Sequence, residues 1–135
     1  MGQLTQPLHV MSHAHVDSTW QPELGLSRLD HDVALMIEIA QMIESAFSSR
    51  LSAMENSALR HDFESLRQHT HSQLPSLKLL GFDQQAKVFE AFESAVVMAD
   101  EIACRQLSPI IQGMWRDIIE SLNAYLKSPK FKSCT

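Results

Sequence analysis

The chain has 135 residues, of which 44% are hydrophobic and 20% charged, and its formal net charge is −5. This length and composition predict one soluble globular domain with a buried core. Lys and Arg number 11 against 16 Asp and Glu, so we do not expect the basic surface with which nucleic-acid-binding proteins neutralise phosphates. No apolar run approaches the roughly 20 residues that cross a bilayer, and we expect no membrane segment.

The first 25 residues are polar and show no sustained apolar period. We interpret 1–25 as an N-terminal extension, with a short helix expected around Trp20, followed by a helical domain over 26–128 and a tail over 129–135. The start of the chain lacks the basic and apolar regions of a secretory signal. Only two cysteines occur, which together with the missing signal favours a cytoplasmic protein with reduced thiols.

Beyond the extension, apolar residues recur at the three- and four-residue spacing of a helix face. This pattern predicts a long helix over 30–54, with a break at Asn56 and Ser57. A second helix is predicted after Asp62, whose side chain is placed to cap it. Gly81 is placed to end that second helix.

Two more helices are predicted in the second half of the chain. Asp83 is placed to cap a third helix that ends near Arg105. Ser108 followed by Pro109 is typical of an N-cap with proline in the first turn, and predicts a fourth helix that reaches about Tyr125. Amphipathic helices with short connections bury their apolar faces most simply against one another. We therefore expect an all-α monomer, an antiparallel up-down-up-down four-helix bundle with an N-terminal extension.

The seven histidines include one with informative surroundings, His71. At 100° per residue, Arg67 and Lys78 lie on the same helix face as His71. Apolar residues occupy the other side of this helix, so we expect the face with His71 to be turned to solvent. An exposed imidazole between two cations is suited to receiving a phosphoryl group.

The residues around His71 resemble the histidine-containing phosphotransfer (HPt) domains of two-component phosphorelays. The resemblance covers roughly 29–126. Its markers are an acidic residue at −9, a leucine at −5, a small residue at −1, a glycine at +10 and an apolar-Glu pair on the third helix: Asp62, Leu66, Thr70, Gly81 and Phe92-Glu93. They select His71 over His69, for which every marker is two positions out of register.

Two positions depart from the family pattern. Leu74 stands where the family has Lys at +3, and Pro75 stands where it has Gly at +4. Proline has no N–H for the carbonyl of His71, so we expect the helix to kink there. Lys78 is expected to reach back toward His71 and replace the missing charge. The expected supporting residues are Arg67, Gln73, Pro75, Ser76 and Lys78.

The resemblance implies a phosphorelay intermediate that accepts a phosphoryl group on His71 from a receiver-domain aspartate and passes it to another response regulator. The implied partners are response-regulator receiver domains and a hybrid sensor histidine kinase. The chain would have no cofactor of its own, because Mg²⁺ is expected on the receiver, and it would be a carrier rather than a stand-alone enzyme. Leu74 and Pro75 keep an alternative open: a degenerate bundle that only docks a receiver domain or kinase, without phosphotransfer.

Metal-binding functions have weaker support. A metal- or oxygen-binding bundle needs histidines and carboxylates on facing helices, but the third and fourth predicted helices contain no histidine. The segment His13-Ala-His15 copies the metal motif of barrel hydrolases only superficially, since those chains are far longer. We therefore expect no metal site.

Overall fold

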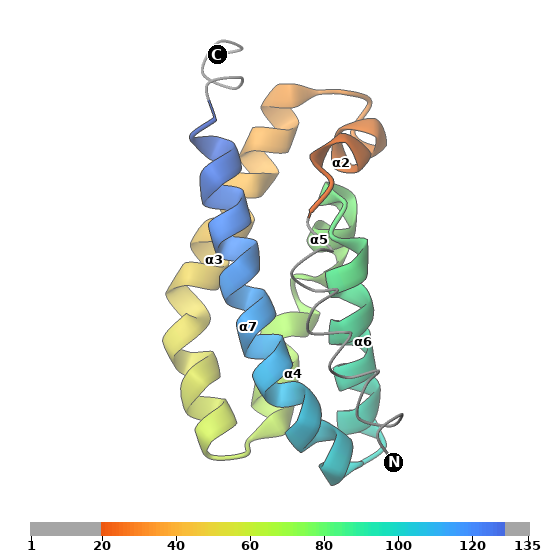
Figure 1. Cartoon of the computed structure of the whole chain (residues 1–135), viewed down its shortest axis with the longest axis vertical. Coiled ribbons are helices and arrows are strands. Elements are labelled where there is room, and N and C mark those ends of the chain that lie inside the picture. The colour runs from red at the N-terminus through yellow and green to blue at the C-terminus, as the bar shows by residue number, and fades with distance from the viewer. Residues whose placement is uncertain (1–19, 129–135) are drawn as a thin grey trace, which may run out of the picture.

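The computed structural model describes residues 20–128, and every regular element in this part of the chain is a helix. The elements are α2 (Pro22–Arg28), α3 (Val33–Leu59), α4 (Phe63–His71), α5 (Leu74–Leu80), α6 (Asp83–Val97) and α7 (Glu101–Leu126). The two long helices α3 and α7 lie side by side, α6 packs against α7 and α4, and α2 packs against α5 (Figure 1). The prediction of an all-α protein is confirmed. None of the helices between residues 20 and 128 is long and apolar enough to cross a membrane.

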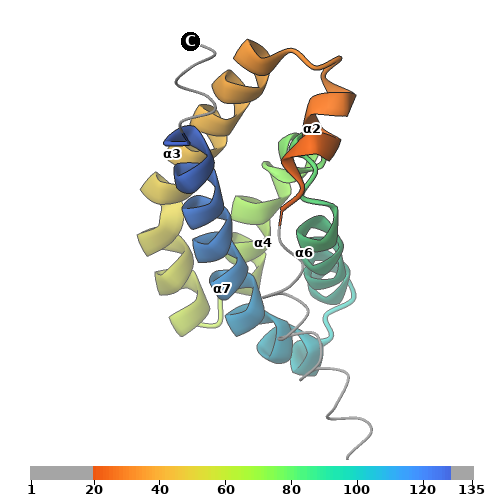
Figure 2. The ribbon, with the colours of Figure 1, turned by 45° about the horizontal axis from the view of Figure 1, so that its top comes forward.

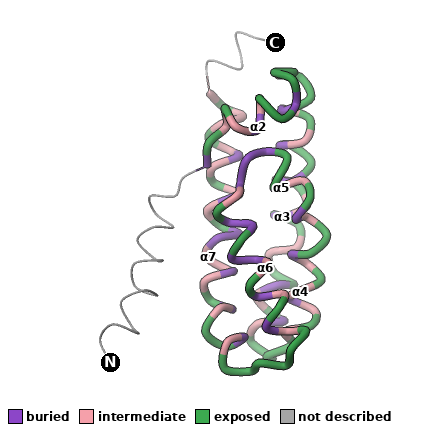
Figure 3. Tube along the Cα trace, turned by 90° about the vertical axis from the view of Figure 1, so that its right-hand side faces the viewer, coloured by how far each residue is buried: buried purple, intermediate pink, exposed green. Residues whose placement is uncertain are grey.

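Helices α3, α4, α6 and α7 surround a common interior (Figure 2). Buried apolar side chains from these helices and from α5 form a single core. Its largest fully buried side chains include Phe47, Phe89, Phe92 and Trp115. The rings of Phe47 and Trp115 stack with their centroids 3.8 Å apart. Buried positions alternate with exposed ones along the long helices α3, α6 and α7 (Figure 3), which agrees with the apolar periodicity of the sequence. Burial of each such side chain contributes about 1.5–3 kcal/mol to folding.

Three helix junctions share one two-residue arrangement. A residue in the left-handed conformation, with φ between 55° and 59°, precedes an aspartate that is the N-cap of the next helix. In each case the carboxylate accepts a backbone N–H from the first turn of that helix. The pairs are His31-Asp32, His61-Asp62 and Ala99-Asp100. The predicted capping role of Asp62 is thereby confirmed.

The predicted end of the first helix is wrong. The helix does not break at Asn56 and Ser57 but continues to Leu59. Ser57 is buried, and its hydroxyl donates to Ser65 Oγ of α4 at 3.1 Å. Its side chain thus binds the neighbouring helix instead of competing for the backbone of its own. The chain turns only where His61 adopts the left-handed conformation.

The predicted boundary between the third and fourth helices is also wrong. α6 ends at Val97 rather than near Arg105, and α7 begins at Glu101, so Pro109 lies inside α7. Pro109 and Arg105 are both exposed. The carbonyl of Arg105, which loses its helical partner to the proline, therefore lies on the solvent side of α7, where water can replace the lost hydrogen bond.

The short helix α2 is fastened to the junction of α5 and α6. The indole N–H of Trp20 donates to the carbonyl of Leu80 at 2.6 Å, and the indole stacks on Phe82. Both outer nitrogens of Arg28 bind the carboxylate of Asp83 at 2.7 Å. The prediction that Asp83 caps this helix is therefore wrong: Asp83 is the first residue of α6. Its carboxylate binds Arg28 and not a backbone N–H of the first turn.

Glycines allow the close approach of these segments. A Cβ on Gly25 would lie 2.3 Å from the carbonyl oxygen of Leu80. Gly81 ends α5 with a φ of 93°, a left-handed conformation that disfavours other residues. The predicted end of the second helix at Gly81 is therefore confirmed.

Candidate functional site

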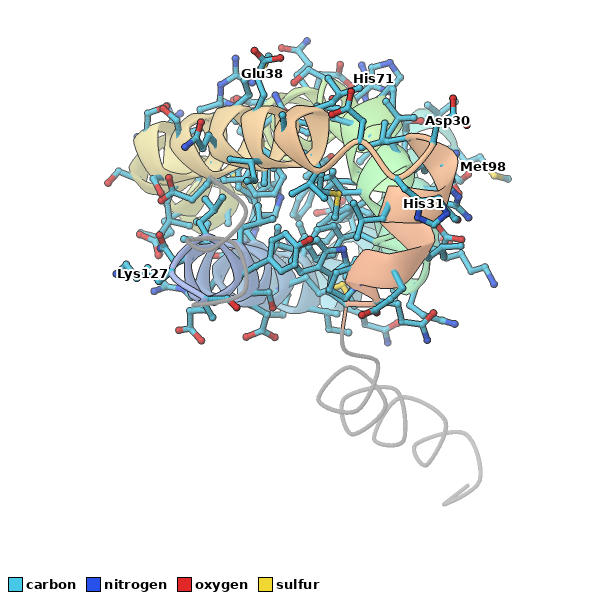
Figure 4. The ribbon with its side chains drawn as sticks, turned by 90° about the horizontal axis from the view of Figure 1, so that it is seen from above. Asp30, His31, Glu38, His71, Met98 and Lys127 are labelled. Carbon is cyan, nitrogen blue, oxygen red and sulfur yellow. The ribbon has the colours of Figure 1, made fainter. Side chains whose placement is uncertain are left out.

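His71 is the last residue of α4 and points away from the core (Figure 4). Its side chain is 60% exposed. The preceding turn carries Leu66 and Thr70, which are 0% and 1% exposed and anchor the helix from the inside. The Thr70 hydroxyl donates to the carbonyl of Arg67 at 2.9 Å, so this buried polar group is satisfied.

The kink expected at His71 takes the form of a break between α4 and α5. Ser72 and Gln73 separate the two helices, and Pro75 is the second residue of α5. A proline in a first helical turn costs little, because the N–H groups there have no helical partner in any case. The chain thus accommodates Pro75 by restarting the helix, and His71 stands at the edge of this break.

Glu93 of α6 holds the His71 ring. Its Oε2 atom contacts His71 Nδ1, and the Glu93 side chain is 24% exposed. Because an ionised carboxylate only accepts hydrogen bonds, the neutral ring that fits this contact carries its proton on Nδ1. The lone pair then lies on Nε2. The arrangement presents an oriented and exposed nitrogen nucleophile.

Arg67 lies beside His71, as predicted, but it is already paired with two carboxylates. Its Nη2 atom lies 2.6 Å from Glu64 Oε2, and its Nη1 atom lies 3.4 Å from the Glu93 Oε2 atom that contacts His71. The hydrogen bond that Arg67 donates to Glu64 raises the pKa of Arg67, and the same bond lowers the pKa of Glu64. Arg67 therefore helps to position Glu93, and Glu93 in turn positions the imidazole ring.

Contrary to the prediction, Lys78 does not bind at His71. Its Nζ atom lies 2.5 Å from Glu90 Oε2 of α6. The break in front of α5 interrupts the continuous helix on which the expected reach of Lys78 depended, and the Lys78 ammonium pairs with Glu90 instead. The position three residues after His71 also offers no charge, because it is occupied by Leu74. This leucine is 7% exposed and belongs to the core.

The remaining expected residues lie near the break but contribute less. The side-chain amide of Gln73 lies 3.5 Å from Ser72 Oγ, Ser76 is half-buried and Pro75 is exposed. Within residues 20–128, neither Gln73 nor Ser76 hydrogen-bonds to His71. Pro75 and Leu79 both line a pocket of about 500 Å³ between α5 and α6. Leu79 is 42% exposed.

Two residues of the site were not among the predicted site residues. Glu93 had a sequence signal, since it belongs to the apolar-Glu marker pair whose Phe92 is fully buried. Arg50 of α3 had none: its Nη1 atom donates to Ser72 Oγ at 3.1 Å, across 22 positions of sequence. His69 of α4 also lies near Arg50. Burial and, to a smaller extent, the charge of Arg50 lower the pKa of His69.

Among the residues that the structure describes, no three His, Cys, Asp or Glu side chains are grouped so that they could hold a metal ion. His13 and His15 lie outside the described residues. Comparisons of the chain with protein-family models, with curated proteins and with solved structures find no match. The function must therefore be inferred from the residues and geometry of this chain.

Proposed function

We propose that the chain is a phosphorelay carrier of the HPt kind, which accepts a phosphoryl group on His71 from a receiver-domain aspartate and passes it to another response regulator. The observation that carries this proposal is the contact between Glu93 and His71 Nδ1. It leaves Nε2 as the nucleophile on a ring that is 60% exposed. A histidine kept only for packing has no need of either feature.

The proposed framework is an antiparallel up-down-up-down four-helix bundle made of α3, the pair α4 and α5, α6 and α7, with 1–25 as an N-terminal extension. The contacts of α3 with α7 and α4, and of α6 with α7 and α4, support this arrangement. Such a bundle places the break after His71 on an outer face, where a folded partner can reach it.

The proposed chemistry needs no proton transfer in the chemical step. The Nε2 lone pair forms a bond to phosphorus while the bond from phosphorus to the aspartyl oxygen breaks, and the aspartate leaves as a carboxylate. Nδ1 keeps its proton, so the phosphorylated ring is cationic. The carboxylate of Glu93 stabilises that developing positive charge, and this interaction strengthens as the reaction proceeds.

The proposed partners are response-regulator receiver domains and a hybrid sensor histidine kinase, in the cytoplasm, with the carrier as a monomer. The receiver would contribute Mg²⁺ and most of the charge stabilisation. The surface offered to it includes Pro75 and Leu79 at the pocket between α5 and α6. Exposed apolar groups beside charged ones are typical of small, transient interfaces.

A second function has one specific observation in its favour. Leu74 lies in the core and Lys78 is bound by Glu90, so α5 supplies no free cation to His71. This favours, as the alternative, a degenerate bundle that docks a receiver domain or kinase and regulates it without phosphotransfer.

The test is transfer of labelled phosphate from a panel of phosphorylated receiver domains. The wild type should acquire acid-labile label, His71→Gln should acquire none, and His69→Gln should retain most of it. Circular dichroism should show all three proteins equally helical. A wild type that binds a receiver but takes up no label from any of them contradicts the carrier function and supports docking alone.

A further inference from the structure

The cations expected at His71 are already paired. Arg67 is bound by Glu64 and Glu93, and Lys78 is bound by Glu90. A phosphoryl group on Nε2 would bring about two negative charges to this surface. A hydrogen-bond donor that is not already bound to a carboxylate can bind the phosphoryl oxygens without first breaking an ion pair.

Arg50 is placed differently from these two residues. It projects from α3 toward the C-terminal end of α4, where its Nη1 donates to the hydroxyl of Ser72, the residue directly after His71. In the part of the chain that the structure describes, no carboxylate pairs with Arg50. Its charge also reaches His69, whose pKa it lowers in addition to burial. Arg50 is thus a cation beside the break whose described side-chain partner is a neutral hydroxyl.

We propose that Arg50 binds the phosphoryl group carried by His71 and replaces, from a different helix, the lysine that HPt domains have at +3. This inference rests on the proposed function. A guanidinium has five N–H donors in a planar fork suited to phosphoryl oxygens. Ser72, to which Arg50 donates, directly follows His71 in the chain, so the guanidinium lies at the residue next to the proposed phosphoryl acceptor. With the charge supplied by α3, Leu74 is left to fill the core.

The inference can be tested without a partner protein, with phosphoramidate as the phosphoryl donor. Nε2 forms a bond to phosphorus, the P–N bond of phosphoramidate breaks, and ammonia leaves. Phosphorus NMR then follows the phosphohistidine signals as pH is varied, and the signal that is missing from His71→Gln identifies phosphorylated His71. Both the phosphoryl oxygens and the ring hold a proton more tightly once a nearby cation is removed. The charges of Glu64, Arg67 and Glu93 also face this group and are the same in every Arg50 variant.

Arg50→Gln should move the titration midpoint of phosphorylated His71 upward by about 0.3–0.7 pH units, which corresponds to an exposed ion pair. Arg50→Lys should restore most of the shift. Arg60→Gln, at the residue that caps the C-terminus of α3, is the matched control ten residues and so about 15 Å farther along, and should leave the midpoint unchanged. An unmoved midpoint in Arg50→Gln overturns the role of Arg50 alone. The absence of a His71 signal in the wild type overturns the proposed function together with this inference.

Discussion

The carboxylate of Glu93 contacts Nδ1 of His71 across the boundary between α6 and α4, although the two residues are 22 positions apart in the chain. The same oxygen lies 3.4 Å from Arg67 Nη1. One side chain therefore fixes the tautomer of the ring that suits attack through Nε2 and is itself held by a cation. Arg67 and Glu93 act on the imidazole as a unit.

Glu93→Gln should slow phosphoryl uptake by His71 about tenfold, which corresponds to about 1.4 kcal/mol. The amide can still accept a hydrogen bond from Nδ1, but it carries no charge to stabilise the cationic product. The measurement is the initial rate of labelling from a phosphorylated receiver. Glu90→Gln is the control, because Glu90 binds Lys78 and not His71. An equal loss in both variants contradicts a specific role for Glu93.

Gly25→Ala should lower the free energy of unfolding by about 1–3 kcal/mol, because the new Cβ would lie 2.3 Å from the backbone oxygen of Leu80. Urea denaturation measures the change. Gly113→Ala is the matched control: nothing lies within 4 Å of a Cβ at this helical position, so this variant should gain about 0.5–1 kcal/mol from helix propensity. Equal stability of the two variants would show that α2 is not seated on Leu80.

Ala99→Gly should stabilise the protein by up to about 1 kcal/mol. Ala99 has a φ of 56°, a left-handed conformation that costs roughly 1–2 kcal/mol for a residue with a Cβ, and glycine removes most of that cost. Ala91→Gly, on the exposed face of α6, should instead destabilise by about 1 kcal/mol. Thermal unfolding of the two variants should give shifts of opposite sign, and a lowered melting temperature for Ala99→Gly argues against a strained turn.

The ion pair of Arg28 and Asp83 should make stability depend on pH below about 4. The hydrogen bond from Arg28 lowers the pKa of Asp83 below its usual value near 3.9. The stabilising contribution is therefore present above pH 4 and is lost as pH falls through the lowered pKa. Urea midpoints at pH 5 and pH 3 should differ less in Asp83→Asn than in the wild type. The same difference in both proteins would exclude this pair as a source of acid sensitivity.

Local signals in the sequence identified the parts of the fold that depend on a single residue type. Asp62 caps α4 and Gly81 ends α5 through contacts within their own segment of chain. The cap predicted at Asp83 is wrong because Arg28 of α2 binds that carboxylate. The turn at Ala99 had no such signal, since alanine seldom adopts a positive φ. Pro109 misled the prediction because a proline on the exposed side of a helix can remain inside it.

The candidate site divides in the same way. Helical spacing predicted that Arg67 lies beside His71, and this follows from one helix alone. The pairing of Lys78 with Glu90 and the approach of Arg50 to Ser72 depend on how separate helices pack. Spacing within a helix carries no information about such contacts, so the actual partners of these cations could not be predicted.

The position of Trp20 also gives the molecule a built-in optical probe. Its indole bridges Leu80 and Phe82 at the seat of α2, whereas the second described indole, Trp115, is fully buried in the core with no hydrogen-bond partner for its N–H. In a Trp115→Phe variant, the emission of Trp20 would report on the seat of α2, and far-ultraviolet dichroism would report on the helices as a whole. If the Trp20 emission changes at a lower denaturant concentration than the dichroism, α2 detaches as a cooperative unit of its own before the core unfolds.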